Sequence, residues 1–254
     1  MLKHDYFHSL NFQPEENCLA EKVILITGAG AGIGQTAAKT FAAHGATVIL
    51  LGKTTKKLEQ TYDDIVAAGY PQPAIFPLDL LGANPDHYAE MAKTIEEHFG
   101  RLDGLLHNAS ILGELAPIAN QNIEQWFKVQ QINVNAPFML TQACLPLLTK
   151  SASASLVFTS SGVGRRGRAY WGAYSVSKFA TEGFMQILAD ELETNTNVRS
   201  NAINPGATRT MMRAKAYPGE DPQSLKTPEE IMPLYLYLMS DASKDINGQT
   251  LDAQ

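Results

Sequence analysis

The chain has 254 residues, 44% of them hydrophobic and 18% charged, and its net charge is −6, which together predict a folded globular protein. The acidic balance argues against electrostatic binding to nucleic acid or to a membrane surface. Two cysteines, Cys18 and Cys144, are too few for a disulfide framework, and the polar N-terminus lacks an apolar signal segment, so a cytoplasmic location is expected.

Short apolar runs alternate with helix-period segments along the chain, which is typical of βαβ units and a parallel sheet. Strands are expected at 23–26, 47–51, 74–78, 102–107, 155–159, 198–203 and 249–251. Helices are expected at 33–43, over most of 124–148 and at 174–192. Another helix is expected to carry Leu58, Tyr62, Ile65 and Val66 on one inward side. A further helix is expected to begin at Asn84 and Pro85.

The long helix at 124–148 contains an uncharged run, 129–149, of membrane-spanning length. Its asparagines, glutamines and prolines favour a buried core helix instead, so no membrane partner is expected. Pro137 should kink or shorten this helix, because proline removes a backbone donor and clashes one turn back.

Nothing in the sequence marks a second domain. Residues 1–20 are interpreted as an N-terminal extension and 21–254 as a single domain of the Rossmann type, an α/β doubly wound fold. The irregular stretch at about 207–227 is too long for an ordinary connection, so it is interpreted as a lid. Its apolar residues Met211, Met212, Ala214, Ala216 and Tyr217 suit a non-polar substrate, with packing on the body of the protein as the alternative.

The glycine-rich run TGAGAGIG, from Thr27 to Gly34, follows an expected strand and opens an expected helix. Glycines allow the tight turn and let a pyrophosphate approach the free N–H groups of the helix. This setting predicts nucleotide binding, with a purely structural turn as the alternative. The run lacks the Lys-Ser/Thr of a P-loop.

Tyr174 and Lys178 are four residues apart, so they share one face of a helix. An ammonium near a phenol lowers the pKa of the tyrosine, which suits a general acid or base that exchanges a proton with an alcohol or carbonyl. Taken alone, the pair could be a solvated helix face. Ser161, thirteen residues upstream at the end of an expected strand, strengthens the catalytic interpretation.

Together, the T-G-x-x-x-G-I-G spacing of Gly28, Gly32 and Gly34 and the order of Ser161, Tyr174 and Lys178 resemble the short-chain dehydrogenase/reductase family, from Glu21 to the C-terminus. The resemblance implies a seven-stranded parallel sheet in the order 3-2-1-4-5-6-7 with helices on both faces. It also implies hydride transfer between a nicotinamide and a small carbonyl or secondary alcohol. Within the family, the motifs look closest to a branch of bacterial oxidoreductases that does not fix a substrate.

The resemblance further implies roles for four catalytic residues. Tyr174 exchanges the substrate proton, Ser161 hydrogen-bonds the carbonyl oxygen, and Lys178 lowers the pKa of the tyrosine and holds the nicotinamide ribose. Asn133 would hold a water that links the lysine to solvent, with a buried structural amide as the alternative. The histidines show no paired ligand spacing, so no metal is expected.

The cofactor site implied by the resemblance is spread over six segments. Its residues are Thr27, Gly28, Gly30, Ala31, Gly32, Ile33, Gly34, Gly52, Lys53, Asp79, Leu80, Asn108, Ala109, Ser110, Tyr174, Lys178, Pro205, Gly206, Thr208 and Thr210. His107 and Ser110 depart from the family's N-N-A-G loop. At the end of a buried strand, His107 is interpreted as a hydrogen-bonded core residue rather than a catalytic one.

Gly52 stands where NAD enzymes of the family carry an aspartate that binds the ribose hydroxyls and repels a 2′-phosphate. Lys53 can hold that phosphate, so NADP(H) is favoured and NAD(H) remains possible. Ala31 stands where NADP(H) members often carry a second base. Lys56 and Lys57 are expected to be solvated.

Several questions stay open on the sequence. Arg165, Arg166 and Arg168 could read an anionic substrate, or lie in a solvated loop or subunit contact. The resemblance implies a homodimer or homotetramer that packs through the long helix and the Tyr174 helix. Other functional classes are a silent cofactor-binding sensor or scaffold, and an RNA binder using RRGR, which the acidic charge disfavours.

Overall fold

The computed structural model describes residues 6–254, and within them the strands form a seven-stranded parallel sheet in the order β3-β2-β1-β4-β5-β6-β7. This confirms the predicted fold class and strand order. The strands are β1 (Val23–Thr27), β2 (Thr47–Gly52), β3 (Ala74–Pro77), β4 (Gly104–His107), β5 (Ala154–Thr159), β6 (Val198–Asn204) and β7 (Thr250–Asp252).

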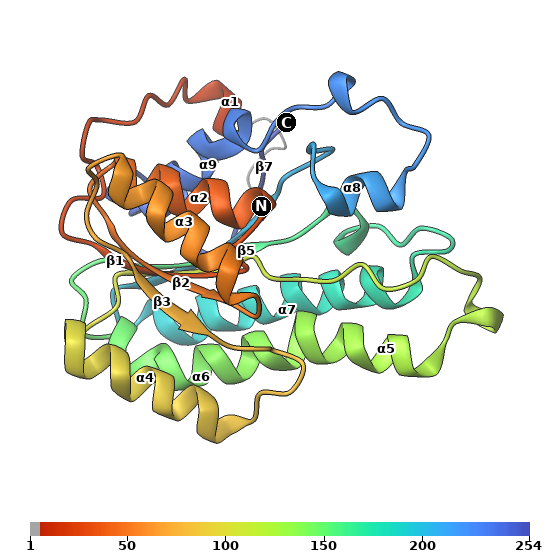
Figure 1. Cartoon of the computed structure of the whole chain (residues 1–254), viewed down its shortest axis with the longest axis horizontal. Helices are drawn as coiled ribbons and strands as arrows, with labels where there is room; N and C mark the ends of the chain where they lie inside the picture. Colours follow the sequence, from red (N-terminus) through yellow and green to blue (C-terminus); the bar gives the residue numbers. More distant parts are fainter. Residues whose placement is uncertain (1–5) are drawn as a thin grey trace.

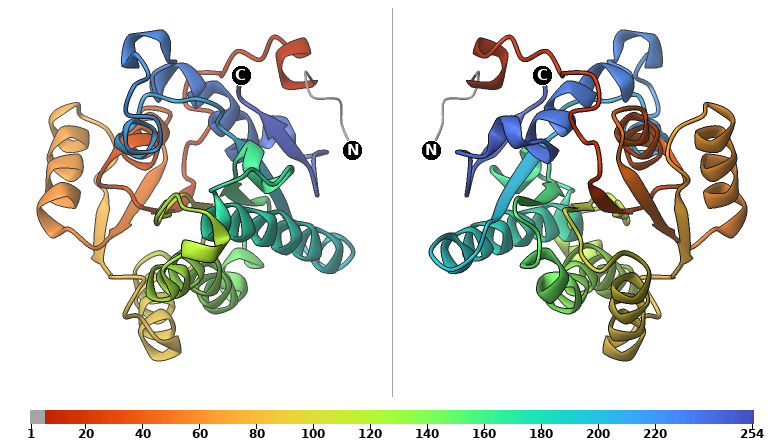
Figure 2. Two further views of the ribbon diagram at one scale, coloured as in Figure 1. Left: turned by 90° about the vertical axis from the view of Figure 1, so that its right-hand side faces the viewer. Right: turned by 90° about the vertical axis from the view of Figure 1, so that its left-hand side faces the viewer.

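Helices cover both faces of the sheet (Figures 1 and 2). One face packs against α2 (Gly32–Ala43), α3 (Thr55–Ala67) and α9 (Met232–Met239). The other packs against α4 (Pro85–Phe99), α6 (Ala136–Leu148) and α7 (Gly172–Glu193). The other helical segments are α1 (Tyr6–Ser9), α5 (Ile123–Gln130), α8 (Met211–Ala216), and the short turns Ile118–Asn120, Gly162–Gly164, Pro222–Ser224, Glu229–Ile231 and Asp241–Ser243.

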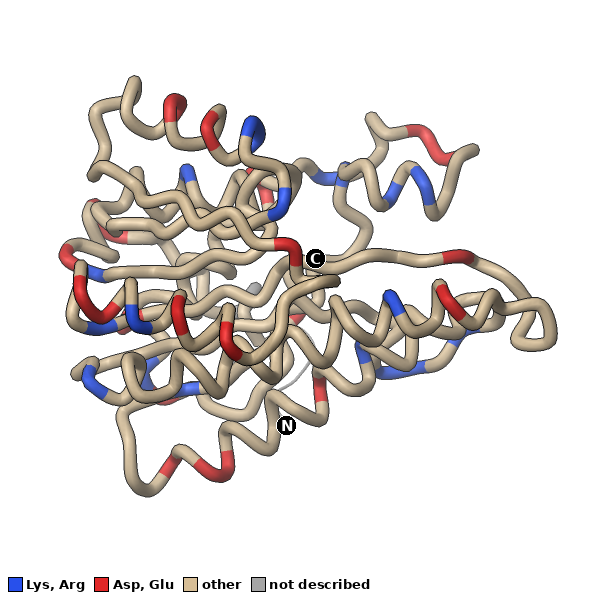
Figure 3. The backbone as a smooth tube through the Cα atoms, turned by 60° about the horizontal axis from the view of Figure 1, so that its bottom comes forward, with Lys and Arg blue, Asp and Glu red and all other residues tan. Residues whose placement is uncertain are grey.

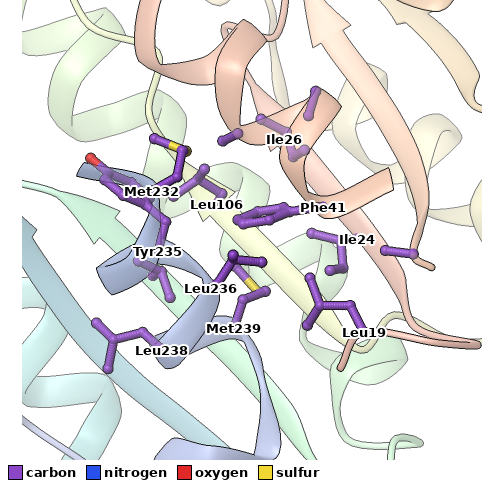
Figure 4. Close-up of a cluster of buried hydrophobic side chains, with 14 of the residues drawn as sticks. Leu19, Ile24, Ile26, Phe41, Leu106, Met232, Tyr235, Leu236, Leu238 and Met239 are labelled. Atoms are coloured by element: carbon purple, nitrogen blue, oxygen red, sulfur yellow. The ribbon is translucent and has the colours of Figure 1, made fainter. Parts of the chain in front are cut away.

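Strands β1 to β6 contribute to two separate cores, because neighbouring side chains of a strand point to opposite faces. Ile24 and Ile26 of β1 join the cluster drawn in Figure 4, where they lie around the fully buried Phe41 of α2. Val23 and Leu25 join the cluster on the other face. Val66 was expected to point inward on α3, but it is 45% exposed, so that assignment is wrong.

The predicted long helix is interrupted just before Pro137. Residues Gln131–Asn135 form a π-helical turn between α5 and α6, with the Ala136 N–H bonded to the Gln131 carbonyl. Pro137 has no N–H to give to the Asn133 carbonyl four residues earlier, which explains the break at this point. Within residues 6–254, no helix is both long enough and apolar enough to cross a membrane.

The first described residues pack on the body of the molecule. The rings of Phe7 and Phe12 lie 5.5 and 5.1 Å from the ring of Tyr237 in α9. Leu19 is fully buried in the same core. Residues 1–5 of the predicted extension lie outside the described residues, and the division at residue 20 stays a prediction.

The carboxyl ends of the strands meet along one edge of the sheet, and strand order reverses between β1 and β4. In doubly wound folds, ligands bind in the crevice at this switch point. Four residues singled out in the sequence lie within two residues of strand ends: Gly28 after β1, Asn108 after β4, Ser161 after β5 and Pro205 after β6. The topology therefore gathers segments that are far apart in the chain.

His107, the last residue of β4, is a core residue as predicted. Its ring stacks on Phe158 at a centroid distance of 4.7 Å and an angle of 16°, and its Nε2 lies 2.8 Å from the Thr141 hydroxyl. Burial lowers the pKa of His107 to about 3. The imidazole therefore stays neutral in the native state over the physiological range.

This burial makes stability depend on pH. The folded pKa lies below that of a free histidine, about 6.5, so the unfolded chain takes up the proton first and stability falls as the pH drops below that value. Between pH 7 and pH 5 we expect wild type to lose about 2 kcal/mol more than His107→Gln, measured by urea unfolding. Parallel losses in the two proteins would contradict a neutral buried His107.

Candidate active site

A cavity of about 810 Å³ opens at the carboxyl ends of the strands, and it collects most of the predicted site residues. The predicted residues on its wall are Gly28, Gly30, Ala31, Gly32, Ile33, Gly52, Lys53, Asp79, Leu80, Asn108, Ala109, Ser110, Ser161, Tyr174, Pro205, Gly206, Thr208 and Thr210. Thr27, Gly34, Asn133 and Lys178 are outside this wall. They lie behind it and support it.

The glycine turn is built by backbone conformation and by close approach. Gly28 and Gly32 adopt φ values of +71° and +56°, which side chains disfavour. A Cβ on Gly34 would lie 2.4 Å from the Gly28 carbonyl oxygen. Ala31 caps α2 without a side-chain hydrogen bond, so the first N–H groups of the helix are left for an anion.

Thr27 ties the glycine turn to the loop after β4. Its hydroxyl donates to the Leu106 carbonyl and accepts from the N–H groups of Asn108 and Ala109, each at 3.0 Å. The Asn108 side-chain amide donates back to the Thr27 carbonyl. Thr27 and Asn108 therefore fix two walls of the cavity relative to each other.

Two lysines of the basic segment after β2 line the cavity, where the prediction placed one. Lys53 lines the cavity beside Gly52, as expected, and Lys57 lines it too. A Cβ on Gly30 would lie 2.8 Å from the Lys57 Cβ, so the first turn of α3 packs against the glycine turn. Lys57 is exposed, as expected, and its place on the cavity wall was not predicted. Lys56, one residue earlier, is exposed and is not part of the cavity wall.

Tyr174 and Lys178 lie on the buried face of α7, as their spacing predicts. The Lys178 Nζ lies 5.4 Å from the Tyr174 ring centroid and donates to the Thr159 carbonyl at 2.8 Å. Ser161 hydrogen-bonds to Tyr174, so the end of β5 contacts both side chains.

The two pKa values are set mainly by burial. Burial raises the pKa of Tyr174 to about 12, against a smaller lowering by the Ser161 hydrogen bond. The lowering of the Tyr174 pKa that was expected from Lys178 does not outweigh the effect of burial. Burial also lowers the pKa of Lys178 to about 8, which the charge of Glu182 opposes. In this arrangement Tyr174 is a neutral phenol at neutral pH, ready to donate a proton.

Asn133 is a buried anchor in the π-helical turn. Its Oδ1 accepts from the Ile111 N–H at 2.9 Å, and its Nδ2 donates to the Ile111 carbonyl and to the Ser177 hydroxyl, each at 3.0 Å. These bonds hold the loop after β4 against α7. The side chain thus anchors this loop, and its role in holding a water stays a prediction.

Apolar residues surround the outer part of the cavity, and of these the sequence singled out those of the lid but not the others. They include Ile111, Leu112, Ile132, Trp171, Met211, Met212 and Ala216. Three of them, Met211, Met212 and Ala216, belong to the predicted lid, which α8 occupies. The Trp171 ring lies 5.8 Å from the Tyr174 ring and 5.8 Å from that of Tyr217, which follows α8. Among the residues outside the lid, only Trp171 had a signal, which is its position three residues before the predicted tyrosine.

The arginines near the cavity have partners within the protein. Arg165 binds both carboxylate oxygens of Asp252, at 2.9 and 3.0 Å. Arg168 donates to the Tyr217 hydroxyl at 2.6 Å. Arg213 binds Glu220 with two hydrogen bonds and lies 3.8 Å from the Tyr217 ring centroid. Of the three arginines considered from the sequence, none lines the cavity.

This fold, with a glycine turn, a Ser-Tyr-Lys group and a shared cavity, defines a class of protein. A family model described as short chain dehydrogenase matches residues 22–221. The chain belongs to the short-chain dehydrogenase family and is an oxidoreductase of the kind that acts on CH–OH and C=O groups. The family resemblance of the motifs is thus confirmed.

Individual relatives are similar over nearly the whole chain. The uncharacterized oxidoreductase YciK of Escherichia coli (strain K12) is 55% identical over 245 residues, covering 96% of each chain, which confirms the bacterial branch. A putative short chain dehydrogenase from Pseudomonas syringae is 57% identical, with a TM-score of 0.95, over 96% of this chain and 99% of that one. A putative short chain dehydrogenase from Escherichia coli CFT073, solved with NADPH, is 55% identical, with a TM-score of 0.92, over 95% and 100%.

Proposed function

We propose that this protein is an NADP(H)-dependent oxidoreductase that interconverts a small carbonyl compound and its secondary alcohol. The observation that carries the proposal is the pairing of a neutral buried phenol, Tyr174, with an ammonium, Lys178, at the wall of a cavity with a glycine turn. The nicotinamide, when bound, supplies or accepts the hydride. The protein's own residues handle the proton and the orientation.

In the reducing direction, the Tyr174 hydroxyl donates its proton to the carbonyl oxygen as that oxygen becomes negative. Ser161, hydrogen-bonded to Tyr174, stabilises the developing charge, an effect of about 3 kcal/mol per donor. Lys178 stabilises the phenolate that is left behind, since its ammonium lies under the same ring. Asn133 supports this group by fixing Ile111 and Ser177, and it is proposed to hold a water that links Lys178 to solvent.

The residues present fit a dinucleotide with a 2′-phosphate. A side chain at Gly28 is disfavoured by its φ of +71° and by the 3.1 Å distance that a Cβ would have to the Ala109 Cα. The α2 N-terminus offers free N–H groups for the pyrophosphate. Gly52 leaves the ribose end without a repelling carboxylate. Lys57 reaches the glycine turn from α3, so it replaces the second base that Ala31 does not provide. The NADPH complex of the Escherichia coli CFT073 relative supports this choice.

The substrate is proposed to be an uncharged carbonyl compound with an apolar group. The outer cavity wall contains Trp171, Ile111 and Met212, which favour apolar contact. Arg165 and Arg168 are engaged by Asp252 and Tyr217 instead of facing the cavity. Residues 207–227 are proposed to act as the lid over this end.

A homodimer or homotetramer is proposed from exposed apolar side chains on the lower helices of Figure 1. The exposed set is Ile123 and Phe127 on α5, Phe138 on α6, and Val176, Phe179 and Ile187 on α7.

Acidic and basic residues are interspersed along the chain (Figure 3), which does not favour a nucleic-acid partner. A cytoplasmic location is proposed from the free Cys18 and Cys144.

Sedimentation velocity of wild type and Phe127→Glu tests the assembly. We expect a dimer or tetramer for wild type and a shift toward smaller species for the variant, because a charge in an apolar contact is costly. Phe127 is 66% exposed in the single chain, so the substitution leaves the fold intact. A wild-type monomer at micromolar concentration would contradict the proposal.

Tyr174→Phe tests the chemistry. The variant keeps the ring but loses the proton donor, so we expect turnover to fall by about 100-fold or more while NADPH binding is retained. Turnover is read as NADPH oxidation with a carbonyl panel that includes methyl benzoylformate and the benzoylformate anion. Preference for the ester supports an uncharged substrate, and preference for the anion rejects it. Near-wild-type turnover in the variant would reject the mechanism.

Lys57→Gln and Lys56→Gln form a matched pair for the cofactor. We expect Lys57→Gln to weaken binding of adenosine 2′,5′-bisphosphate about tenfold, with little change for adenosine 5′-monophosphate, because one charge-assisted contact is lost. Lys56→Gln should bind both as wild type does. Calorimetry measures both ligands without turnover. Equal effects of the two substitutions on binding would show that Lys57 does not contact the 2′-phosphate.

A further inference from the structure

The end of β5 makes three successive contacts with three successive turns of α7. Ser161 hydrogen-bonds to Tyr174, the Thr159 carbonyl accepts from Lys178 at 2.8 Å, and the Ser160 hydroxyl donates to Glu182 at 2.5 Å. The helix positions are four residues apart, so they share one buried face. The third contact has no part in the proposed proton transfer, yet it also joins the end of β5 to α7.

Glu182 is a buried carboxylate whose neighbours are all donors. Its side chain is 10% exposed and receives hydrogen bonds from the hydroxyls of Ser160 and Thr250. The Arg165 Nε lies 3.8 Å from the same carboxylate. An acceptor that meets only hydroxyl and guanidinium donors is suited to carry its negative charge in the interior.

The charges around Glu182 balance as a group. Arg165 is bound on its other side by Asp252 through two hydrogen bonds, and Asp252 also accepts from the Asn204 amide at 2.7 Å. Two cations, Lys178 and Arg165, thus face two anions, Glu182 and Asp252. Arg165 contacts both anions, and the charge of Glu182 acts on Lys178.

The titratable and charged side chains around Lys178 and Glu182 come from four elements. Tyr174 lies on α7 itself, and Arg165 ends the short turn Gly162–Gly164. Asp252 lies on β7, and Tyr235 of α9 reaches the Thr159 hydroxyl at 3.3 Å. Burial lowers the pKa of Lys178 to about 8, and Glu182 is the charge that opposes this lowering.

We propose that Glu182 is a positioning residue for the reaction, which holds Lys178 in its charged form and fixes the Ser160-Ser161 end of β5. The inference rests on the proposed function, because it assigns Glu182 to the site that contains Tyr174 and Lys178. Arg165 and Asp252 support it by keeping Glu182 in place and by joining β7 to the site.

The sign of the effect follows from the charges. Lys178 is protonated below its pKa, so any property that needs the ammonium is lost as the pH rises through that value. Removing the negative charge of Glu182 moves this loss to lower pH. Removing the positive charge of Arg165 moves it to higher pH. A residue with a purely structural role would not produce opposite shifts.

The experiment compares wild type with Glu182→Gln, Glu182→Asp and Arg165→Gln, using Glu193→Gln as a control. Glu193 is an exposed glutamate at the end of the same helix, so its substitution makes the same charge change far from the site. Two pH profiles are recorded from pH 6 to pH 10: kcat for carbonyl reduction, and the Kd of NADPH from quenching of tryptophan fluorescence. The Kd profile requires no turnover.

We expect the alkaline loss of kcat and of NADPH affinity to move down by about one pH unit in Glu182→Gln. Glu182→Asp should stay near wild type, Arg165→Gln should move up, and Glu193→Gln should not move. Should Glu182→Gln fail to fold, an upward shift of the two pH profiles in Arg165→Gln would still show that the charges of this group act on Lys178. Unmoved profiles, or shifts of the same sign in both variants, would overturn the inference. Absence of turnover in wild type removes the proposed function, while the Kd profiles still test Glu182.

Discussion

The contact on which the site depends is the hydrogen bond from the Lys178 ammonium to the Thr159 carbonyl at the end of β5. It fixes α7 against the sheet at one register. That register also places Tyr174 against Ser161 and Glu182 against Ser160. An ammonium that is 97% buried is costly unless it is hydrogen-bonded and opposed by charge, so this contact requires the network around it.

The parallel sheet provides the remaining constraint. Strand order reverses between β1 and β4, and the loops that follow these strands are joined through Thr27 and Asn108. The same edge carries the glycine turn, whose close contact between Gly34 and Gly28 leaves no room for side chains. A long cavity therefore runs from the basic residues after β2 to the apolar residues of α8. Its two ends have different chemistry, which suits a phosphorylated dinucleotide at one end and an apolar carbonyl compound at the other.

Much of this arrangement was predictable from local patterns. The alternation of apolar runs predicted all seven strands, and Asn84 caps α4 through the His87 N–H, as its position before Pro85 indicates. Pro137 predicted the break in the long helix, since its missing N–H acts on the residue one turn earlier. Positions after strand ends predicted a large part of the cavity wall.

What the sequence could not predict depends on contacts between distant segments. Lys56 and Lys57 look equivalent in the sequence, and only the packing of α3 on Gly30 separates them. Val66 fits an inward pattern but lies at the exposed edge of α3. The pKa of Tyr174 was expected to fall because of Lys178, but burial raises it, and the depth of burial is a property of the assembled fold.

The central claim is that this cavity transfers hydride from NADPH to a carbonyl carbon. The most direct measurement uses NADPH labelled with deuterium at C4 of the nicotinamide, on the transferred face, with an uncharged aryl ketoester. Mass spectrometry of the product then locates the label. We expect an alcohol that carries one deuterium on the former carbonyl carbon. An unlabelled alcohol, or no alcohol with NADPH bound, would contradict it.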